Sequence, residues 1–273
     1  MPVMRATAQQ IGLFISAYLI VSYTYAYGPL GHEIVGKIAE SHLCDQATEE
    51  VARLLQGESL GRASRWPDWI RKDPQWRKSR AWHYINVADN ARVEDALGQS
   101  GGDVVWAIEN FRGELENREL DLSKRKEALS FLAHFIADVH QPLHVGRRED
   151  RGGNSIIVIV DGQETNLHRF WDAQQLLKLD QGDRRYDRDG QVASIRALAS
   201  DRVADLQSAG VLDWARESQA LRPEVYGFDV ASGVLDAKYR AAALEITRAR
   251  LAAAGVRLAG TLNDIFCAVP GPG

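Results

Sequence analysis

Residues 131–144, FLAHFIADVHQPLH, carry the pattern that most constrains the fold of this chain. Apolar residues recur there at the spacing of a helix that faces a core, yet His134, Asp138, His140 and His144 lie among them. Burying such polar groups without partners costs free energy. The fold must therefore bring partners to this helix, either protein groups or metal ions. We expect His140 to be an ordinary core histidine.

Two histidine–aspartate pairs share one spacing. His134 and Asp138 are four residues apart, and the segment NLHRFWD repeats this spacing with His168 and Asp172. On a helix each pair projects from one face, and imidazole and carboxylate together suit zinc. His144 would lie about 80° from His134 on a continuous helix, away from Asp138, which favours a second metal centre. Hydrogen-bonded core histidines are the alternative, and the spacing alone leaves both interpretations open.

Further candidate ligands lie in other segments. SRWPDWIR offers Asp68, with Arg71 three residues later, and AWHYIN offers His83. YGPLGH places His32 five residues after Tyr27, whose α-amino group becomes a possible ligand if the chain is cleaved before it. These groups are too many for one metal ion, so the sequence points to several.

Helical periodicity dominates the chain and predicts an all-α fold. We expect Ser123 to cap one of the helices, because a serine followed by charged residues favours a helix start. The expected helices span 32–43, 46–56, 103–118, 123–141, 167–178, 191–217 and 233–255.

One β-hairpin is predicted at residues 155–167, SIIVIVDGQETNL, because a β-branched run meets an Asp-Gly turn. Residues 58–102 are expected to form long loops with short helical pieces, and residues 180–190 a solvated loop. The tail PGPG at 270–273 is expected to be disordered.

The N-terminus differs from the rest of the chain. IGLFISAYLIVSY has the length of a signal-peptide core, Arg5 precedes it, and Thr24-Tyr25-Ala26 resembles a cleavage site. We therefore expect residues 1–26 to be a cleaved secretory signal and residues 27–273 to form a single domain, secreted or periplasmic. An uncleaved membrane anchor is the alternative, although the run is short for a span.

Export affects the interpretation of the two cysteines, Cys44 and Cys267, which lie near opposite ends of the mature chain. In an oxidising compartment a disulfide between them is favoured. Two buried thiols that pack as small hydrophobic groups are the alternative.

The formal net charge is −4, and the sequence has no basic stretch that would follow a phosphate backbone. Composition therefore argues against a conventional nucleic-acid-binding domain. If the protein acts on phosphates, positive charge must come from elsewhere.

Taken in order, the chemistry-bearing segments resemble the zinc-dependent single-strand-specific nucleases of the S1/P1 type, which share their fold with bacterial zinc phospholipase C. The resemblance runs from Tyr27 to about Asp172. Its matching pieces are GxxGH at 28–32, WPDWIR at 66–71, WHYIN at 82–86, FLAHFIADVHQPLH at 131–144, RGGNSI at 151–156 and NLHRFWD at 166–172.

The resemblance implies a single helical domain with three zinc ions. One ion would be held by Asp68, His83, His134 and Asp138. A second would be held by His144, His168 and Asp172. The third would take His32, Asp138 as a bridge, and the backbone amine and carbonyl of Tyr27, where the family usually has tryptophan. This last site requires cleavage after Ala26, because only a free N-terminus offers an amine.

The resemblance also implies the chemistry. Asp68 and Arg71 would act in catalysis, Tyr84 would stack on a base, Asn86 would meet its edge, and Asn154 would contact the substrate. Water between zinc ions loses a proton near neutral pH, which supplies a nucleophile. Other interpretations are a surface salt bridge for Arg71, a packing ring for Tyr84 and a turn residue for Asn86.

The expected activity is therefore endonucleolytic hydrolysis of single-stranded DNA and RNA to 5′-phosphate products, with 3′-mononucleotides as further candidate substrates. We expect a monomer with no stable protein partner and no membrane span after signal cleavage. A zinc phospholipase C is the close alternative, although that branch usually has glutamate where this chain has Asp172. A zinc-storage protein is a second alternative, which would bind zinc without cleaving phosphodiesters.

Overall fold

The computed structural model describes residues 27–98, 101–176 and 188–267. The predicted signal segment, most of the predicted loop at 180–190 and the PGPG tail lie outside the described residues. The helices are α1 (Gly28–Glu40), α2 (Asp45–Leu55), α3 (Leu60–Ala63), α4 (Trp66–Ile70), α5 (Val104–Glu116), α6 (Leu122–Val139), α7 (Leu167–Arg169), α9 (Arg188–Arg196), α10 (Val203–Ser208), α11 (Val211–Ala220), α12 (Arg222–Val225) and α13 (Ala237–Cys267).

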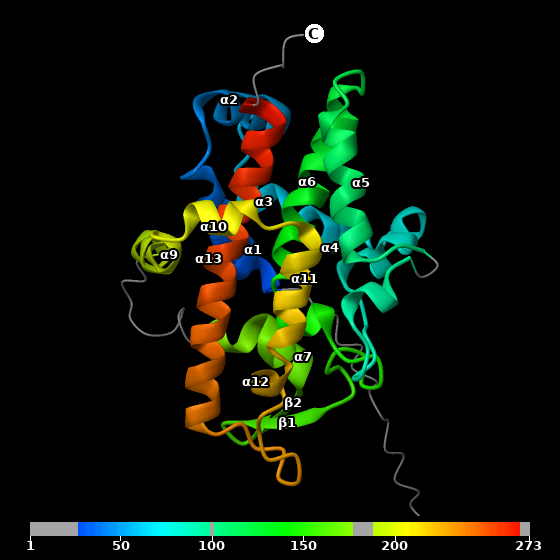
Figure 1. Cartoon of the computed structure of the whole chain (residues 1–273), viewed down its shortest axis with the longest axis vertical. Coiled ribbons are helices and arrows are strands. Elements are labelled where there is room, and N and C mark those ends of the chain that lie inside the picture. The colour runs from blue at the N-terminus through cyan, green and yellow to red at the C-terminus, as the bar shows by residue number, and fades with distance from the viewer. Residues whose placement is uncertain (1–26, 99–100, 177–187, 268–273) are drawn as a thin grey trace, which may run out of the picture.

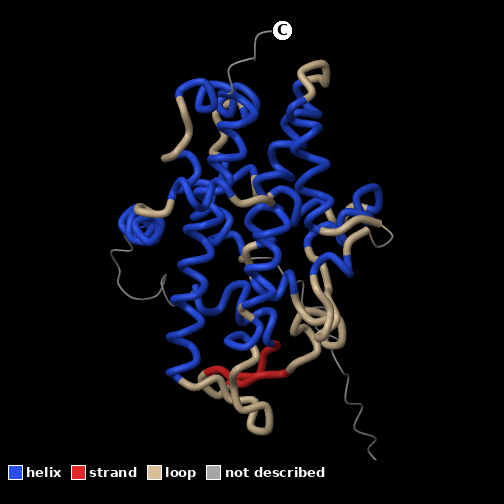
Figure 2. The backbone as a smooth tube through the Cα atoms, in the orientation of Figure 1, coloured by secondary structure: helices blue, strands red, loops and turns tan. Residues whose placement is uncertain are grey.

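Shorter elements connect these helices. They are the 3₁₀ helices η1 (Pro74–His83), η2 (Val93–Ala96), η3 (Pro142–Val145) and η5 (Ala197–Ala199), the π-helical stretch η4 (Phe170–Gln174), and the strands β1 (Ile157–Val160) and β2 (Gln163–Asn166). The strands lie together at one end of a helical body (Figure 2). The all-α fold with one hairpin is thus confirmed.

Helix α6 lies at the centre of the core, and every residue from Ala128 to Val139 is buried. Phe131 stacks on Phe111 of α5, with ring centroids 4.4 Å apart, and on Phe135 one turn along α6. Helix α5 packs along α6, and α1 packs along α13, which runs the length of the molecule (Figure 1). The apolar stripe of the FLAHFIADVHQPLH helix is therefore core, as its spacing indicates.

The start of α6 differs from the prediction. Asp121, rather than Ser123, caps the helix, because the Asp121 carboxylate accepts a hydrogen bond from the backbone N–H of Lys124 at 2.9 Å. The Ser123 hydroxyl donates to the same carboxylate at 2.7 Å. The serine therefore lies inside the first turn and supports the cap.

The predicted helix at 191–217 is wrong, because the chain breaks into α9, η5, α10 and α11. Ala209 is extended and offers its carbonyl to the Trp214 indole N–H at 2.9 Å, while the Asp213 carboxylate accepts from the N–H of Gly210. These local partners begin a new helix in place of continuing the old one. Residues 188–190, predicted as loop, begin α9.

Two further helices differ in extent. The helix predicted at 233–255 begins at Ala237, where the Asp236 carboxylate accepts from the N–H of Tyr239 at 2.7 Å, and continues to Cys267. Its second half stays helical because that half is buried almost throughout. In the described part of the helix predicted at 167–178, a short α-helix is followed by a π-helical stretch. The short helical pieces expected at 58–102 are present as α3, α4, η1 and η2, but the long loops are not, because these helices fill most of the described part of that segment.

The predicted hairpin is confirmed, with Ile157 opposite Asn166 and Val160 opposite Gln163. Its turn uses positive φ at Asp161 (51°) and Gly162 (77°), as an Asp-Gly hairpin turn requires. At the open end the N–H of Leu167 donates to the Ile156 carbonyl at 2.9 Å. The hairpin therefore brings the start of α7 back to the chain segment that precedes β1.

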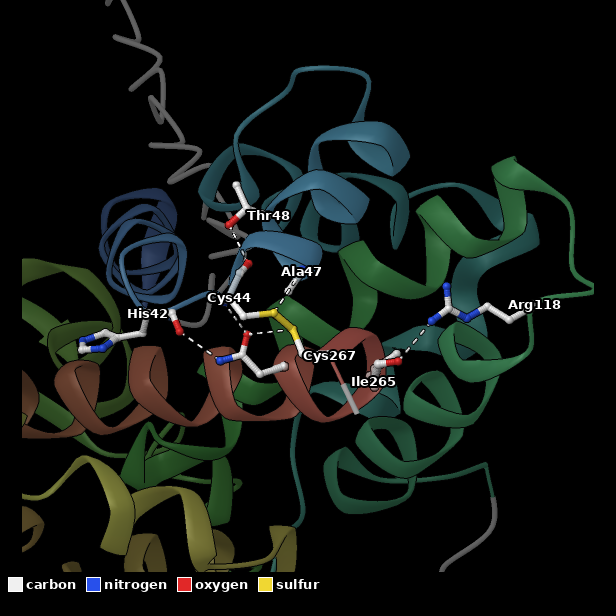
Figure 3. Close-up of a disulfide and its surroundings, with 8 residues drawn as sticks. His42, Cys44, Ala47, Thr48, Arg118, Ile265 and Cys267 are labelled. Carbon is white, nitrogen blue, oxygen red and sulfur yellow. Dashed lines mark hydrogen bonds between the residues drawn. A yellow bond between two sulfur atoms is a disulfide. The ribbon is translucent and has the colours of Figure 1, made fainter. Parts of the chain in front are cut away.

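The predicted disulfide is also confirmed. Cys44 and Cys267 are bonded across a sequence separation of 223 and join the start of α2 to the end of α13 (Figure 3). Beside the bond, the Asn263 amide accepts from the N–H of Cys44 at 2.9 Å and donates to the His42 carbonyl at 3.0 Å. Among the described residues, no helix is both long and apolar enough to cross a membrane.

Candidate metal centre

The side chains predicted as metal ligands gather at one place in the fold. Helices α1, α4 and α6, the 3₁₀ helices η1 and η3, and the α7–η4 segment each contribute to it. Ligand-type atoms lie within 4.8 Å of one another in three buried groups: first Asp68, His83 and His134; second His144, His168 and Asp172; and third His32, His134 and Asp138.

The first group is built around Asp138. The Nε2 atom of His134 lies 3.1 Å from Asp138 Oδ2, one helical turn away, and the Nδ1 atom of His83 lies 3.0 Å from the same oxygen. The two histidine nitrogens are 2.9 Å apart. Asp68 completes the group from α4, and burial raises the pKa of its carboxyl to about 6. Lone pairs from separate elements thus converge on a small volume.

The second group joins η3 to the α7–η4 segment. The Nε2 atom of His168 lies 3.3 Å from Asp172 Oδ2, and that of His144 lies 3.7 Å from Oδ1. Helix α6 ends at Val139, so His144 reaches this group through η3 and not along a continuous helix. The Gln141 amide donates to Asp172 Oδ1 at 2.7 Å and thereby orients the carboxylate.

The third group links α1 to α6. His32 Nε2 lies 3.6 Å from Asp138 Oδ1, and the rings of His32 and His134 stack with centroids 4.1 Å apart. Tyr27 directly precedes α1 and is fully buried, and its hydroxyl donates to the His140 carbonyl at 2.9 Å. The side chain of Tyr27 is thus anchored within the core, which fixes its backbone at the beginning of α1.

Backbone carbonyls orient three of the imidazoles. The Nδ1–H of each donates to a carbonyl oxygen: His134 to Ser64 at 2.6 Å, His144 to His83 at 2.5 Å and His168 to Gly152 at 2.6 Å. This arrangement fixes the tautomer and leaves each Nε2 lone pair directed into the group, as in metal sites generally.

Several polar atoms in these groups are buried without a hydrogen-bond partner among the described residues. They are both ring nitrogens of His32, Nε2 of His83 and His144, Oδ1 of Asp138 and Oδ2 of Asp172. Buried polar atoms are normally hydrogen-bonded, so such a concentration needs an explanation. Burial also lowers the pKa of His32 and His168, and that of His83 to about 3, which keeps these rings neutral. Neutral imidazoles and carboxylates with free lone pairs fit divalent metal ions.

A cavity of about 370 Å³ opens over the groups. Its lining comprises Arg71, Arg80, His83, Tyr84, Asn86, Leu143, His144, Arg151, Asn154 and His168. The structure therefore places all four residues predicted to contact substrate without holding metal beside the candidate ligands. Arg71 also forms an ion pair with Asp68, 3.2 Å from its Oδ1, and because the Arg71 side chain is only 13% exposed this pair is largely buried. The Tyr84 ring is 41% exposed and is not a core packing ring.

Three residues of this lining were missed in the sequence: Arg80, Leu143 and Arg151. The available signal was the RGGN segment, in which Arg151 directly precedes two glycines. Gly152 has φ +63°, and a Cβ atom there would lie 2.6 Å from the Leu143 carbonyl oxygen. The backbone thus passes too close to η3 for any side chain, which brings Arg151 to the cavity.

His140 is structural, as expected. Its Nδ1–H donates to the Ile136 carbonyl at 2.7 Å, and its Nε2 accepts from Arg257 at 2.9 Å. Burial, together with the positive charges of Arg250 and Arg257, holds the pKa of His140 well below its usual value. Glu217 binds both arginines, so this charged network supports the end of α6 from behind.

Fold and site together define a helical class of protein in which an open cavity lies over clustered histidine and aspartate side chains of the kind that bind metal. The model of the family described as S1/P1 Nuclease matches residues 27–267. Over 95% of the chain, 30% of residues are identical to Endonuclease 2 of Arabidopsis thaliana, with 99% of that protein covered. Endonuclease 3 of the same plant is 32% identical over 91% of the chain and 92% of its own length. Nuclease P1 of Penicillium citrinum is 27% identical over 88% of the chain and 97% of its own length.

The chain belongs to the S1/P1 nuclease family. The resemblance stated from the sequence is thereby confirmed, as is the predicted class of enzyme, an endonuclease. The family is metal-dependent, in agreement with the buried ligand groups. The match favours a nuclease over the phospholipase C alternative.

Proposed function

We propose that this protein is a zinc-dependent phosphodiesterase that cuts single-stranded DNA and RNA endonucleolytically and leaves 5′-phosphates, with 3′-mononucleotides as additional substrates. One observation carries the proposal. His83, His144 and His168, from two of the ligand groups, line the same cavity as Arg71 and Tyr84. A phosphate at the cavity floor would therefore meet metal and guanidinium together, while a base would reach the exposed ring.

The proposed site holds three zinc ions. The first is assigned to Asp68, His83, His134 and Asp138. The second is assigned to His144, His168 and Asp172. The third is assigned to His32, Asp138 and the backbone amine and carbonyl of Tyr27. The contacts of Asp138 with both His32 and the first group support its role as the shared ligand.

When bound, the zinc ions would lower the pKa of water and neutralise charge that develops on the phosphate. The protein groups supply positioning. The guanidinium of Arg71 is held by Asp68 at the cavity edge and suits a bidentate contact with two phosphate oxygens. The Tyr84 ring offers a stacking surface that accepts any base but requires an unpaired one, which favours single strands. Asn86 and Asn154 offer amides for a base edge or sugar.

The proposal includes cleavage of residues 1–26 and export as a monomer to the periplasm or the medium. A family match that begins at residue 27 and a disulfide typical of oxidising compartments support it. Full burial of Tyr27 supports it as well, because a ligand at the new N-terminus must be held rigidly.

The decisive experiment is metal analysis of the secreted, mature protein combined with cleavage of end-labelled DNA. We expect zinc to copurify, single strands to be cut faster than duplex of the same sequence, and the products to carry 5′-phosphates. Chelation should abolish cleavage and zinc should restore it. Cleavage of phosphatidylcholine without cleavage of DNA would instead establish the phospholipase alternative, and zinc without either activity would indicate storage.

Two variants test the assigned roles. Asp138→Asn should lose bound zinc and activity together, because one oxygen of its carboxylate faces His32 and the other faces His83 and His134. His42→Gln is the matched control, since His42 lies outside every ligand group. Tyr84→Ala should weaken nucleotide binding and retain full zinc content, and loss of zinc would assign that ring a structural role. An Asp138→Asn variant with full activity would refute the mechanism.

A further inference from the structure

Arg80 and Arg151 form, with Arg71, an arginine rim around the cavity that composition alone did not reveal. We propose that Arg80 and Arg151 bind the phosphates on either side of the scissile one, so that the site selects a chain of linked nucleotides over a substrate with a single phosphate. This inference rests on the proposed function.

The charge of the cavity supports this role. Its lining contains three arginines and no aspartate or glutamate, in a chain whose formal net charge is −4. A single phosphodiester at the floor is already served by the ligand groups and by Arg71, which lies against Asp68. Two additional guanidinium groups exceed what one phosphate needs. Uncompensated positive charge at a cavity mouth attracts further phosphates.

A hydrogen bond to the backbone positions the Arg80 side chain for such a contact. It lies on η1, is exposed, and donates from Nε to the Arg71 carbonyl at 3.2 Å. This bond orients the guanidinium group, to which Nε belongs. Within the described ranges no carboxylate pairs with Arg80, whereas exposed arginines such as Arg53 and Arg216 bind carboxylates. Arg80 therefore lines the cavity without a carboxylate partner among the described residues.

Arg151 joins the lining from a different segment, the RGGN loop. Its φ is +59°, a left-handed conformation that costs a non-glycine residue roughly 1 kcal/mol. Such strain at the edge of a site points to a function for the side chain. The Arg151 carbonyl accepts from the Asn154 amide at 2.9 Å, which fixes the loop in this form. No ion pair joins Arg151 to a carboxylate in the described part of the chain.

The size of the cavity places the neighbouring phosphates at its rim. A volume of about 370 Å³ is at the lower end of ligand pockets, enough for one nucleotide-sized group. The chain on either side must then leave over the exposed edge, where Arg80 and Arg151 lie. A phospholipid head group has one phosphodiester and no use for these two side chains.

The test compares two substrates of the zinc-loaded enzyme. One is a short single-stranded oligonucleotide, and the other is a dinucleoside monophosphate, which has only the scissile phosphate. The variants are Arg80→Gln, Arg151→Gln and the pair combined. Arg77→Gln and Arg148→Gln are matched controls, because these exposed arginines belong to the same two segments and lie outside the cavity lining. The net charge changes equally in test and control variants.

We expect each single test variant to raise KM for the oligonucleotide about tenfold, with little change in kcat, as loss of one charge-assisted contact predicts, and the combined variant to raise it further. The ratio of kcat/KM between oligonucleotide and dinucleoside should fall by the same factor. The log–log salt slope for oligonucleotide binding should become shallower by about 0.7 per arginine removed. The controls should retain wild-type ratios and slopes.

Arg151→Gly separates the side chain from the loop, because glycine adopts the same φ without strain. It should raise KM as Arg151→Gln does while keeping zinc content and thermal stability. A test variant with an unchanged substrate ratio and salt slope would overturn the inference, as would an equal loss on both substrates. A wild-type enzyme that cuts neither substrate would instead refute the proposed function itself.

Discussion

Removing the Cys44–Cys267 disulfide should destabilise the protein without altering the metal centre. We consider the double variant Cys44→Ser/Cys267→Ser, which leaves no unpaired thiol. The bond closes a loop across a sequence separation of 223. The chain-entropy relation gives about 5 kcal/mol for a loop of that length, an upper value because real denatured chains retain structure. We therefore expect a loss of about 3–5 kcal/mol in the free energy of unfolding.

The native state should change little. Serine replaces Cys44 as the cap of α2, a role that its hydroxyl performs well. Asn263 still bridges the two segments through its bonds to Cys44 and to the His42 carbonyl. The effect should therefore fall on the unfolded chain, which becomes less restricted.

Urea unfolding of the zinc-loaded proteins measures this effect. The midpoint should fall and the m-value should rise, because an unfolded chain without the cross-link exposes more surface. Zinc content and nuclease activity at low temperature should match wild type, and reduced wild type should behave as the variant does. A loss below about 1 kcal/mol in the free energy of unfolding, with an unchanged m-value, would refute the conclusion that the disulfide stabilises the protein by restricting the unfolded chain.

Three further outcomes follow from the structure. Gly152→Ala should lower the free energy of unfolding by about 2–4 kcal/mol, because a Cβ there would lie 2.6 Å from a carbonyl oxygen and the φ is positive. Gly57→Ala is the control: its φ is +82° but the space around it is open, so the loss in the same thermal-unfolding assay should be only about 1 kcal/mol. Glu217→Gln should cost about 2 kcal/mol by urea unfolding, because it leaves Arg250 and Arg257 without their carboxylate, and an unchanged midpoint would contradict that role. Chelation should lower the melting temperature of the wild type, because bound metal stabilises only the folded state; equal melting temperatures with and without chelator would argue against metal in the buried groups.

Local patterns predicted those elements whose geometry depends on a few neighbouring residues. The Asp161-Gly162 pair specified the hairpin turn, because the positive φ values that these two residues tolerate match the twist of the flanking strands. By contrast, the prediction of one helix at 191–217 was wrong, because the spacing of apolar residues says nothing about polar side chains that cap a new helix within the segment. At Gly210 the Asp213 carboxylate offers a new cap, and the earlier helix cannot continue past it.

The candidate site likewise has features that the sequence predicted and features that only the structure showed. Membership of the three ligand groups was inferred from the resemblance and not from spacing, and the role of these residues as zinc ligands stays a prediction. The structure brings their side chains together. His144 joins its group from η3, which follows Gln141, and not from a continuation of the preceding helix. Arg80 belongs to none of the matching pieces, and Arg151 begins RGGNSI without an assigned role, so only the fold showed that they share a cavity.

The sequence by itself determined the helical class, the hairpin and the two pairs His134–Asp138 and His168–Asp172, whose spacing puts both side chains of a pair on one face; in the structure they approach to 3.1 and 3.3 Å. Tertiary structure decided which pair faces which partner, where the long helices break, and which arginines surround the cavity. The physical reason is the distance along the chain over which each interaction acts. Backbone geometry acts over about four residues and can be read locally, whereas burial and charge act between segments that only folding brings together.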